Sequence, residues 1–141
     1  MESESRLRHA LVVRYGPELG RDLTAECLAY GWERWDRVGG MKNPVGYLFR
    51  VGQSRSRRYR RPKPLFPAVP AGHEYEFEPG LTDALSNLSD RQRMVVVLIH
   101  SYGWTLTEVA NLLDIGLTTV QKHEERGLLK LRKALEVNVD A

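Results

Sequence analysis

Residues 105–127 of the chain read TLTEVANLLDIGLTTVQKHEERG. Thr105 precedes Glu108 by three positions, a capping-box pattern in which a hydroxyl and a carboxylate bond to backbone amides that the first helical turn leaves free. The apolar residues that follow recur at steps of three and four, which places them on one face of a helix. They are Leu106, Val109, Ala110 and Leu113. We therefore expect a helix that begins directly after Thr105.

A second helical pattern follows after a short interruption. Asp114 is polar, and Gly116 can adopt turn conformations that cost other residues free energy. The next residues have hydrogen-bonding side chains and are followed by an inward-facing Val120 and an apolar stripe of Leu128, Leu131 and Leu135. The hydrogen-bonding residues are Thr118, Thr119, Gln121, Lys122 and His123. Two short helices joined in this way are a helix-turn-helix pattern.

Such a unit suits DNA because its second helix fits the major groove and brings its first turns to the base edges. The donor and acceptor pattern of those edges differs for each base pair. An ordinary helical hairpin with solvated polar residues is the alternative, because helix-turn-helix matches are common.

The charge is distributed unevenly along the 141 residues, which suffice for one medium domain or two small ones. Residues 1–61 have 13 Lys and Arg against 7 Asp and Glu, residues 62–80 have 1 against 3, and residues 81–141 have 7 against 8. The net charge of +3 therefore originates in the N-terminal part. This distribution favours two domains, at residues 1–61 and 81–141.

The strongest basic stretch lies between residues 50 and 61. It has no acidic residue, and Tyr59 stands among its arginines. Arginines neutralise phosphates and release counterions, and an aromatic ring can stack on an exposed base. The stretch therefore suits a nucleic-acid strand, although a solvated helix end is the usual alternative for a charge run. Its arginines are Arg50, Arg55, Arg57, Arg58, Arg60 and Arg61.

Three helices are expected in the N-terminal domain. The first covers residues 5–14, and the second covers about 21–36 with its inner side formed by an apolar set that includes two tryptophans. That set is Leu23, Cys27, Leu28, Trp32 and Trp35. Asn43 is a good N-cap and Pro44 suits the first helical position, so the third helix starts there. Tyr47, Leu48 and Val51 form its apolar face.

Residues 62–80, PKPLFPAVPAGHEYEFEPG, contain five of the seven prolines and no helical or strand periodicity. They are interpreted as a linker. The three glutamates at alternate positions could imitate a nucleic-acid backbone, or could simply keep a tether soluble. A metal site formed by His73 and these glutamates is a third, weaker interpretation.

The C-terminal domain is expected to contain four helices. A helix at residues 81–88 precedes Ser89 and Gln92, a second capping-box match ahead of the run MVVVLI at 94–99. That run could be a strand, but its cap and neighbours favour a helix. The expected fold is therefore all-α, with two small helical domains joined by a Pro-rich linker.

No catalytic or metal-binding constellation emerges from the sequence. A single cysteine, Cys27, cannot form an internal disulfide, and it is interpreted as a small buried hydrophobe. The four histidines are far apart and have no partners at zinc-ligand spacing. Nothing resembles a signal peptide or a membrane span, so we expect a cytoplasmic protein that is not an enzyme and has no cofactor.

Three segments resemble a bacterial RNA polymerase sigma factor of the extracytoplasmic-function type, within the sigma-70 family. The most specific covers residues 81–135, where LxxRQRxVxxL, xxEVAxLLxI and TVxKHxxRxLxKLR patterns follow one another as in the family's fourth domain. DLTAECLAYGWERWDRV at 22–38 resembles the helix that binds core polymerase. NPVGYLFRVGQSRSRRYRR at 43–61 resembles the promoter-melting helix.

The resemblance implies roles for individual residues. The first turns of the helix-turn-helix would bind the minus-thirty-five element through Thr118, Thr119, Gln121, Lys122 and His123, with Arg126 and Lys130 on phosphates. A base flipped from the minus-ten element would enter the loop containing Met41, Lys42 and Asn43, at a cost of a few kcal/mol. The adjoining backbone would be held by Arg50, Arg55, Arg57, Arg58 and Arg61. Asp22, Glu26 and Trp32 would bind the polymerase clamp.

The partners that the resemblance implies are core RNA polymerase, through its beta-prime clamp and beta flap, and promoter DNA. An anti-sigma factor is a further partner of such proteins, and no residue of this sequence identifies one. Two other hypotheses remain at this point. One is a stand-alone helix-turn-helix regulator that dimerises through its N-terminal half, and the other is an inhibitor that occupies the clamp without promoter use.

Overall fold

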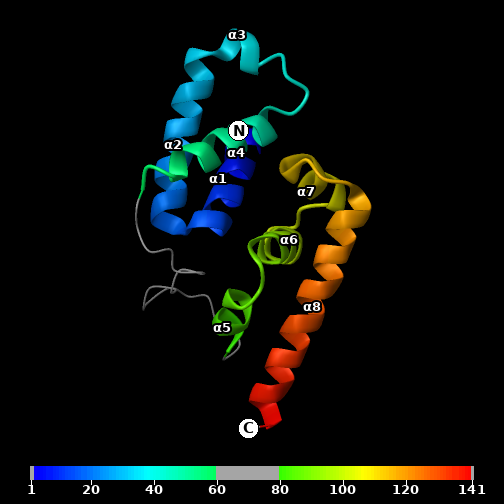
Figure 1. The fold of residues 1–141 in the computed structure, drawn as a ribbon. Coiled ribbons are helices and arrows are strands. Elements are labelled where there is room, and N and C mark those ends of the chain that lie inside the picture. Colours follow the sequence, from blue (N-terminus) through cyan, green and yellow to red (C-terminus); the bar gives the residue numbers. More distant parts are fainter. Residues whose placement is uncertain (1, 60–79, 141) are drawn as a thin grey trace.

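The computed structural model describes residues 2–59 and 80–140, which form helices and no strand (Figure 1). The expected all-α fold is confirmed. The segment expected to be a linker falls outside the described residues except for Gly80, and so do Arg60 and Arg61. The helices are α1 (Glu2–Tyr15), α2 (Pro17–Glu33), α3 (Trp35–Val38), α4 (Pro44–Ser56), α5 (Leu81–Ser86), α6 (Asp90–His100), α7 (Leu106–Leu113) and α8 (Leu117–Asp140).

Helix α2 begins four residues before the predicted start at residue 21. Pro17 occupies its first turn, where the missing N–H costs nothing, and Gly16 has a φ of 95° that turns the chain out of α1. Gly20 lets the two helices pack closely, since an added Cβ there would lie 2.5 Å from Cα of Val12. The helix also ends earlier than predicted, at Glu33, and α3 follows it.

The apolar face of α2 is partly as predicted. Leu23 and Cys27 are fully buried and Leu28 is half-buried, but Trp32 and Trp35 are 75% and 55% exposed. The prediction that both tryptophans lie on the inner side is therefore wrong. A break after Glu33 separates α2 from α3, and the two exposed tryptophans lie on either side of it, one on each helix.

Helix α4 starts as the sequence predicts. The side chain of Asn43 accepts a hydrogen bond of 3.1 Å from the amide of Gly46, and Pro44 is in the first turn. Leu48 is buried and Tyr47 and Val51 are half-buried, while Phe49, which the sequence analysis did not assign to the core, is 1% exposed. Phe49 is buried because α4 has helices on more than one side.

The run at 94–99 is helical, so the strand alternative is wrong. Ser89 and Gln92 form a complete capping box at the start of α6, with the side chain of each bonded to the backbone of the other. Residues 94–98 are all buried because α6 packs against α1 on one side and α8 on another. A helix covered on several faces needs no amphipathic pattern.

Thr105 and Glu108 also form the predicted capping box, at the start of α7. The turn after α7 departs from the prediction: Asp114, with a φ of 55°, adopts the left-handed conformation, and Gly116 does not. Aspartate tolerates this conformation better than most residues because its short polar side chain can bond locally. Val120 is fully buried, as predicted, and it anchors α8.

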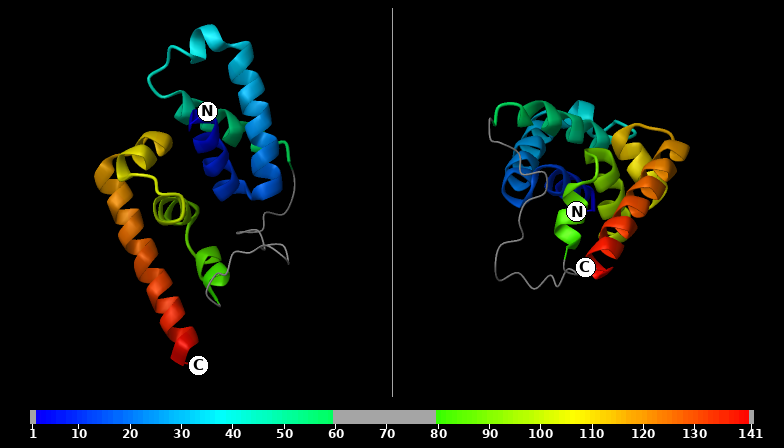
Figure 2. Two further views of the ribbon diagram at one scale, coloured as in Figure 1. Left: turned by 180° about the vertical axis from the view of Figure 1, so that it is seen from behind. Right: turned by 60° about the horizontal axis from the view of Figure 1, so that its bottom comes forward.

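The N-terminal and C-terminal halves pack on each other. Helix α1 contacts α6, and α4 contacts α7, so buried residues from both halves form one hydrophobic core. In Figures 1 and 2, α6 lies between α1 and the long helix α8. The candidate DNA-contacting elements, α4 and the α7–α8 turn, therefore lie next to each other.

Candidate nucleic-acid interface

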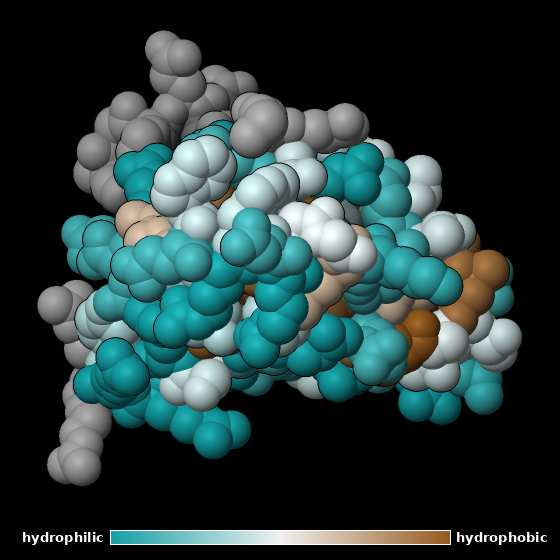
Figure 3. Space-filling view, turned by 90° about the horizontal axis from the view of Figure 1, so that it is seen from above, coloured by the Kyte–Doolittle hydropathy of each residue, from teal (hydrophilic) through white to brown (hydrophobic). Residues whose placement is uncertain are grey.

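The first turns of α8 present the polar side chains that the sequence predicts at a DNA-binding surface. Thr118, Thr119, Gln121 and Lys122 are exposed, while Val120 between them is fully buried. Burial of Val120 holds the helix against the core and turns its neighbours outward. The surface seen from the α3 end of the molecule is predominantly hydrophilic with small hydrophobic patches (Figure 3).

His123 differs from the exposed members of this set because it is half-buried. Its pKa is lowered, first by burial and then by the charges of Arg91 and Arg126. The lowered pKa favours the neutral form of the ring in the free chain. Its Nδ1 atom is buried and has no hydrogen-bond partner within the described residues.

The two residues predicted to contact phosphates from α8 have different surroundings. Arg126 is exposed, whereas Nζ of Lys130 donates a hydrogen bond of 3.1 Å to Oε1 of Gln92. That bond joins α8 to the capping box of α6. Both side chains are exposed, and the bond to Gln92 leaves the other ammonium N–H groups of Lys130 able to donate to a phosphate.

The residues assigned to the minus-ten element are divided between the surface and the contact with α7. Lys42 is exposed and Met41 half-buried in the loop before α4. The Nδ2 atom of Asn43 donates a hydrogen bond of 2.6 Å to the backbone oxygen of Asn111. Arg50 forms an ion pair of 3.5 Å with Asp114.

The remaining described arginines of the basic stretch lie at the far end of α4. Arg57 and Arg58 are exposed, and α4 ends at Ser56, so they extend beyond the helix. Arg55 lies 4.0 Å from the carboxylate of Glu26 and 5.4 Å from the ring centre of Tyr30. Contact of these arginines with a phosphate backbone stays a prediction, and Arg61 lies outside the described residues.

A cluster of two tyrosines and two arginines lies on α2, α3 and α4, and the sequence analysis did not identify it. The hydroxyls of Tyr30 and Tyr47 are 3.0 Å apart, and Arg37 donates a hydrogen bond of 2.7 Å to the Tyr47 hydroxyl. The guanidinium of Arg34 lies 3.9 Å from the ring centre of Tyr30. The pKa of Tyr30 is lowered, first by its hydrogen bond with Tyr47. Only the Arg34–Tyr30 contact, four positions apart, is local; Tyr47 lies 17 positions from Tyr30 and 10 from Arg37, so the whole cluster could be found only once the helix packing was known.

The residues assigned to core polymerase lie along α2. Asp22 is exposed, and Trp32 is the most exposed large hydrophobic residue of the described ranges, with its ring centre 6.2 Å from that of Trp35. Glu26 is instead held within the N-terminal half, because it accepts a hydrogen bond of 2.8 Å from Tyr59. This bond raises the pKa of Tyr59. Asp22 and Trp32 are the members of the set that a partner can reach directly.

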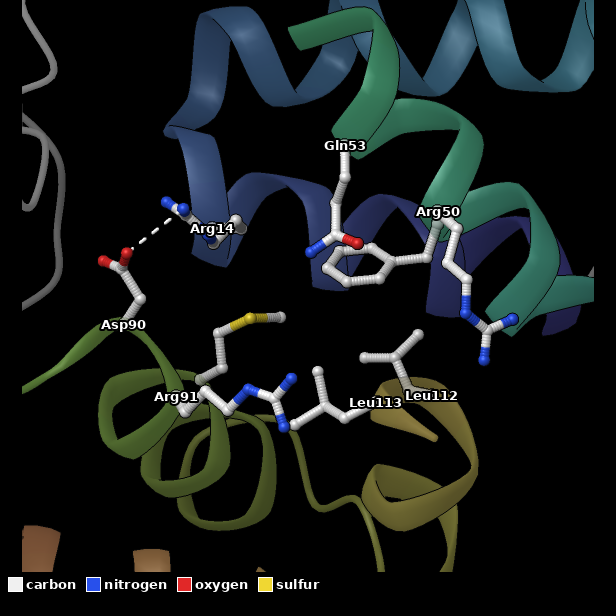
Figure 4. A pocket seen from close by; sticks show the side chains of 9 residues that line it. Arg14, Arg50, Gln53, Asp90, Arg91, Leu112 and Leu113 are labelled. Carbon is white, nitrogen blue, oxygen red and sulfur yellow. Dashed lines mark ion pairs between the residues drawn. The ribbon is translucent and has the colours of Figure 1, made fainter. Parts of the chain in front are cut away.

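A cavity of about 240 Å³ lies between the two halves (Figure 4). Arg14, Arg50 and Gln53 line it from α1 and α4, and Asp90, Arg91 and the α7 leucines line the other side. Arg14 and Asp90 form an ion pair of 3.1 Å across its edge. The volume falls below the usual range for small-molecule sites, so we regard the cavity as a packing gap between the halves.

Neither a metal centre nor a reactive thiol is found in the described part of the chain. No group of three or more His, Cys, Asp or Glu side chains there could hold a metal ion. Burial raises the pKa of Cys27 to about 11, so the thiol is protonated and unreactive at neutral pH. None of the helices within the described ranges combines the length and apolarity needed to cross a membrane.

Comparison with known proteins connects this geometry to transcription. Residues 84–133, from α5 through most of α8, match the family Sigma-70, region 4. The chain is 29% identical over 142 residues to RNA polymerase sigma-E factor of Streptomyces coelicolor, with 94% of this chain and 80% of that protein covered. The region 4 match contains both capping boxes and the exposed first turns of α8.

The fold is also found in a solved sigma factor. The structure of RpoE in complex with the anti-sigma factor NepR from Bartonella quintana is similar with a TM-score of 0.66 and 20% sequence identity, covering 96% of this chain and 93% of that one. Residues 84–133 thus match a sigma-70 region 4 domain, the chain is similar in sequence to a sigma-E factor along nearly its whole length, and it shares the helical fold of a solved sigma factor.

Proposed function

We propose that this chain is the promoter-specificity subunit of an RNA polymerase holoenzyme, in which each half recognises one promoter element. The observation that carries the proposal is the start of α8, where Thr118, Thr119, Gln121 and Lys122 are exposed beside the buried Val120 within the region 4 match. A helix anchored in this way can place its first turns in the major groove. We assign the minus-thirty-five element to this surface.

The minus-ten element is assigned to the N-terminal half. Met41, Lys42 and Asn43 form the loop that would hold a flipped base, and α4 supplies the arginines for the adjoining phosphates. Stacking and phosphate contacts must offset the cost of about a few kcal/mol for taking a base out of the duplex. Arg57 and Arg58, both exposed, are the arginines with the most direct access to such a strand.

The clamp of core polymerase is assigned to Asp22, Glu26 and Trp32 on α2. Exposure of Asp22 and of the Trp32–Trp35 pair supports this assignment, because buried aromatic anchors dominate most protein interfaces. The beta flap is assigned to the C-terminal half. We further propose that residues 1–61 bind core polymerase and the minus-ten element, that residues 81–141 bind the minus-thirty-five element, and that residues 62–80 connect them. The protein is proposed to act in the cytoplasm.

Co-elution with sigma-free core polymerase tests the proposal, followed by transcription of a pool of genomic fragments with the mixture. We expect a stable complex and discrete new start sites, which would also provide the promoter sequence. A complex without transcripts would indicate an inhibitor, and absence of a complex would favour the stand-alone regulator. An anti-sigma factor, the further partner proposed, should compete with core for the chain.

The variant Asp22→Lys tests the clamp assignment within that experiment. Asp22 is exposed, so reversing its charge should weaken core binding without loss of fold, whereas Glu26→Lys would also break the bond to Tyr59. Asp83→Lys is the matched control, since Asp83 is an exposed aspartate in the first turn of α5. Core affinity of Asp22→Lys equal to that of the control would contradict the assignment.

A further inference from the structure

The last described arginines of the basic stretch lie beyond the helix that begins it. Helix α4 ends at Ser56, and Arg57 and Arg58 follow it with exposed side chains. The chain turns tightly at this point, because the amides of Arg58 and Tyr59 donate to backbone oxygens three positions earlier, at 3.0 and 3.1 Å. Arginine side chains lose rotamer entropy when they bind a phosphate, so a backbone that is already fixed lowers the total cost of the contact.

Tyr59 anchors this turn to α2. Its hydroxyl donates a hydrogen bond of 2.8 Å to Oε1 of Glu26, which lies 33 positions earlier in the chain. The ring of Tyr59 is half-buried and packs against the hydrophobic core. A hydrogen bond to a carboxylate is stronger than one between neutral groups, so this contact fixes the chain directly after α4.

The carboxylate of Glu26 is near the end of α4 through both of its oxygens. Oε1 accepts the bond from Tyr59, and Oε2 lies 4.0 Å from Nη1 of Arg55. Oε2 is buried and has no hydrogen-bond partner within the described ranges. Because one oxygen is buried and the other is bonded to Tyr59, the carboxylate acts mainly on groups of its own chain.

The two contacts of this carboxylate flank the exposed arginines. Arg55 lies before the pair Arg57–Arg58 in the chain, and Tyr59 lies directly after it. Glu26 contacts both flanking residues. With the backbone held on each side, the pair has only its side chains left to order when a phosphate binds.

We propose that Glu26 and Tyr59 are positioning residues for the contact of Arg57 and Arg58 with the minus-ten strand. Their bond fixes the backbone that carries the two arginines, so the strand meets a surface that is already ordered. This inference rests on the proposed function, because it uses the minus-ten assignment. It gives Glu26 a role in DNA binding beside its assignment to the clamp, and it makes Tyr59 an anchor instead of a residue that stacks on a base.

The variant Tyr59→Phe separates an anchor from a stacking residue. Phenylalanine keeps the aromatic ring and loses only the hydroxyl that bonds to Glu26, so a ring that stacks on a base would still bind. Holoenzyme is formed with saturating core polymerase and titrated into a fluorescent single strand that covers the minus-ten region of a promoter mapped in the transcription experiment. Tyr102→Phe is the matched control, because it removes a tyrosine hydroxyl in the C-terminal half and keeps the ring that stacks on His9. Circular dichroism verifies the helical content of each variant.

Tyr59→Phe should bind the strand about three- to tenfold more weakly than the wild type, the range expected for one lost hydrogen bond. Its affinity should also depend less on salt, because the slope of log affinity against log salt changes by about 0.7 for each phosphate contact of a single strand. Affinity for core polymerase should stay that of the wild type, and Tyr102→Phe should match the wild type in all three measurements. Unchanged strand affinity in Tyr59→Phe would overturn the inference.

Action through the arginines is tested in a chain that lacks them. In the background Arg57→Gln with Arg58→Gln, the change Tyr59→Phe should cause no further loss of strand affinity, because the residues that Tyr59 positions are absent. A further loss as large as in the wild-type background would mean that Tyr59 acts on the strand directly. That result would also overturn the inference.

Glu26→Ala tests the other partner of the bond. It should weaken strand binding at least as much as Tyr59→Phe, and the two changes together should be no weaker than Glu26→Ala alone. Glu26→Gln keeps an oxygen that can accept the bond from Tyr59, and it should recover most of the affinity. Glu4→Ala, at an exposed glutamate of α1, is the matched control. Losses that multiply in the double variant would contradict a shared contact.

Failure of the inference can be told apart from failure of the proposed function. If the wild-type holoenzyme starts no promoter-specific transcripts, the proposed function fails, whatever the variants show. If it does start them and Tyr59→Phe binds the strand as tightly as the wild type, only the positioning role fails.

Discussion

Trp32 is 75% exposed, whereas Leu23, nine residues earlier on the same helix, is fully buried. Trp32→Ala should therefore change the free energy of unfolding by less than about 1 kcal/mol, while Leu23→Ala should lower it by about 2–5 kcal/mol through the cavity it leaves. Urea denaturation of both variants measures the difference. Core polymerase affinity should fall for Trp32→Ala, and an unchanged affinity would remove Trp32 from the clamp surface.

Two partly buried histidines make stability depend on pH. Burial is the largest cause that lowers the pKa of both His9 and His123 below the ordinary value of 6.5. The unfolded chain then binds protons more readily than the folded one, so stability is full above pH 6.5 and declines as pH falls below it. We expect the decline between pH 7.5 and 5.5 to be smaller in His9→Gln with His123→Gln. The midpoints of urea denaturation of both proteins, measured at the two pH values, check this expectation. An equal decline in stability in the wild type and in the double variant would contradict it.

At the scale of an element, α8 divides into an exposed polar start and a packed remainder. Gln121→Ala with Lys122→Ala should weaken binding of the minus-thirty-five duplex, at about 1–3 kcal/mol for each lost base contact, while core binding persists. Lys133→Ala, at an exposed position three turns later, is the control and should leave promoter selectivity unchanged. Competition binding with matched and scrambled duplexes provides the measurement, and unchanged selectivity in the double variant would refute the α8 assignment.

Local signals were sufficient for the starts of α4, α6 and α7. Both capping boxes, at Ser89 and Thr105, and the Asn43 cap were predicted, because each uses bonds between residues three positions apart. The missed start of α2 had such a signal too, in the Gly16–Pro17 pair. The sequence analysis named Gly116 as a residue that can adopt turn conformations, whereas the left-handed residue after α7 is Asp114, because propensity does not state which position the helix end requires.

At the scale of the whole molecule, the contact between the halves should depend on salt. Screening shortens the reach of electrostatic interactions from about 10 Å at 0.1 M to 3 Å at 1 M salt, which weakens exposed pairs such as Arg50–Asp114. We expect energy transfer between dyes at Ala29→Cys and Lys133→Cys to fall as sodium chloride rises over this range. Sucrose at equal osmolality should leave it unchanged. Constant energy transfer in salt would mean that apolar packing alone sets this contact.

The sequence by itself determined the helices, the helix-turn-helix and the sigma-factor resemblance, because caps, proline positions and apolar periodicity act over a few residues. It also located the basic stretch of α4 and the polar start of α8. The roles of individual DNA-contacting and clamp-contacting residues remain predictions.

Only the tertiary structure decided which residues face each other across the chain. The exposure of Trp32, the bond of Tyr59 to Glu26 and the contact of Asn43 with Asn111 depend on helices that meet from distant parts of the sequence. Periodicity states which residues share a face of a helix, but not what covers that face. The packing of α4 on α7 determines what covers this face of α4. It places the candidate minus-ten residues Asn43 and Arg50 against the helix-turn-helix half.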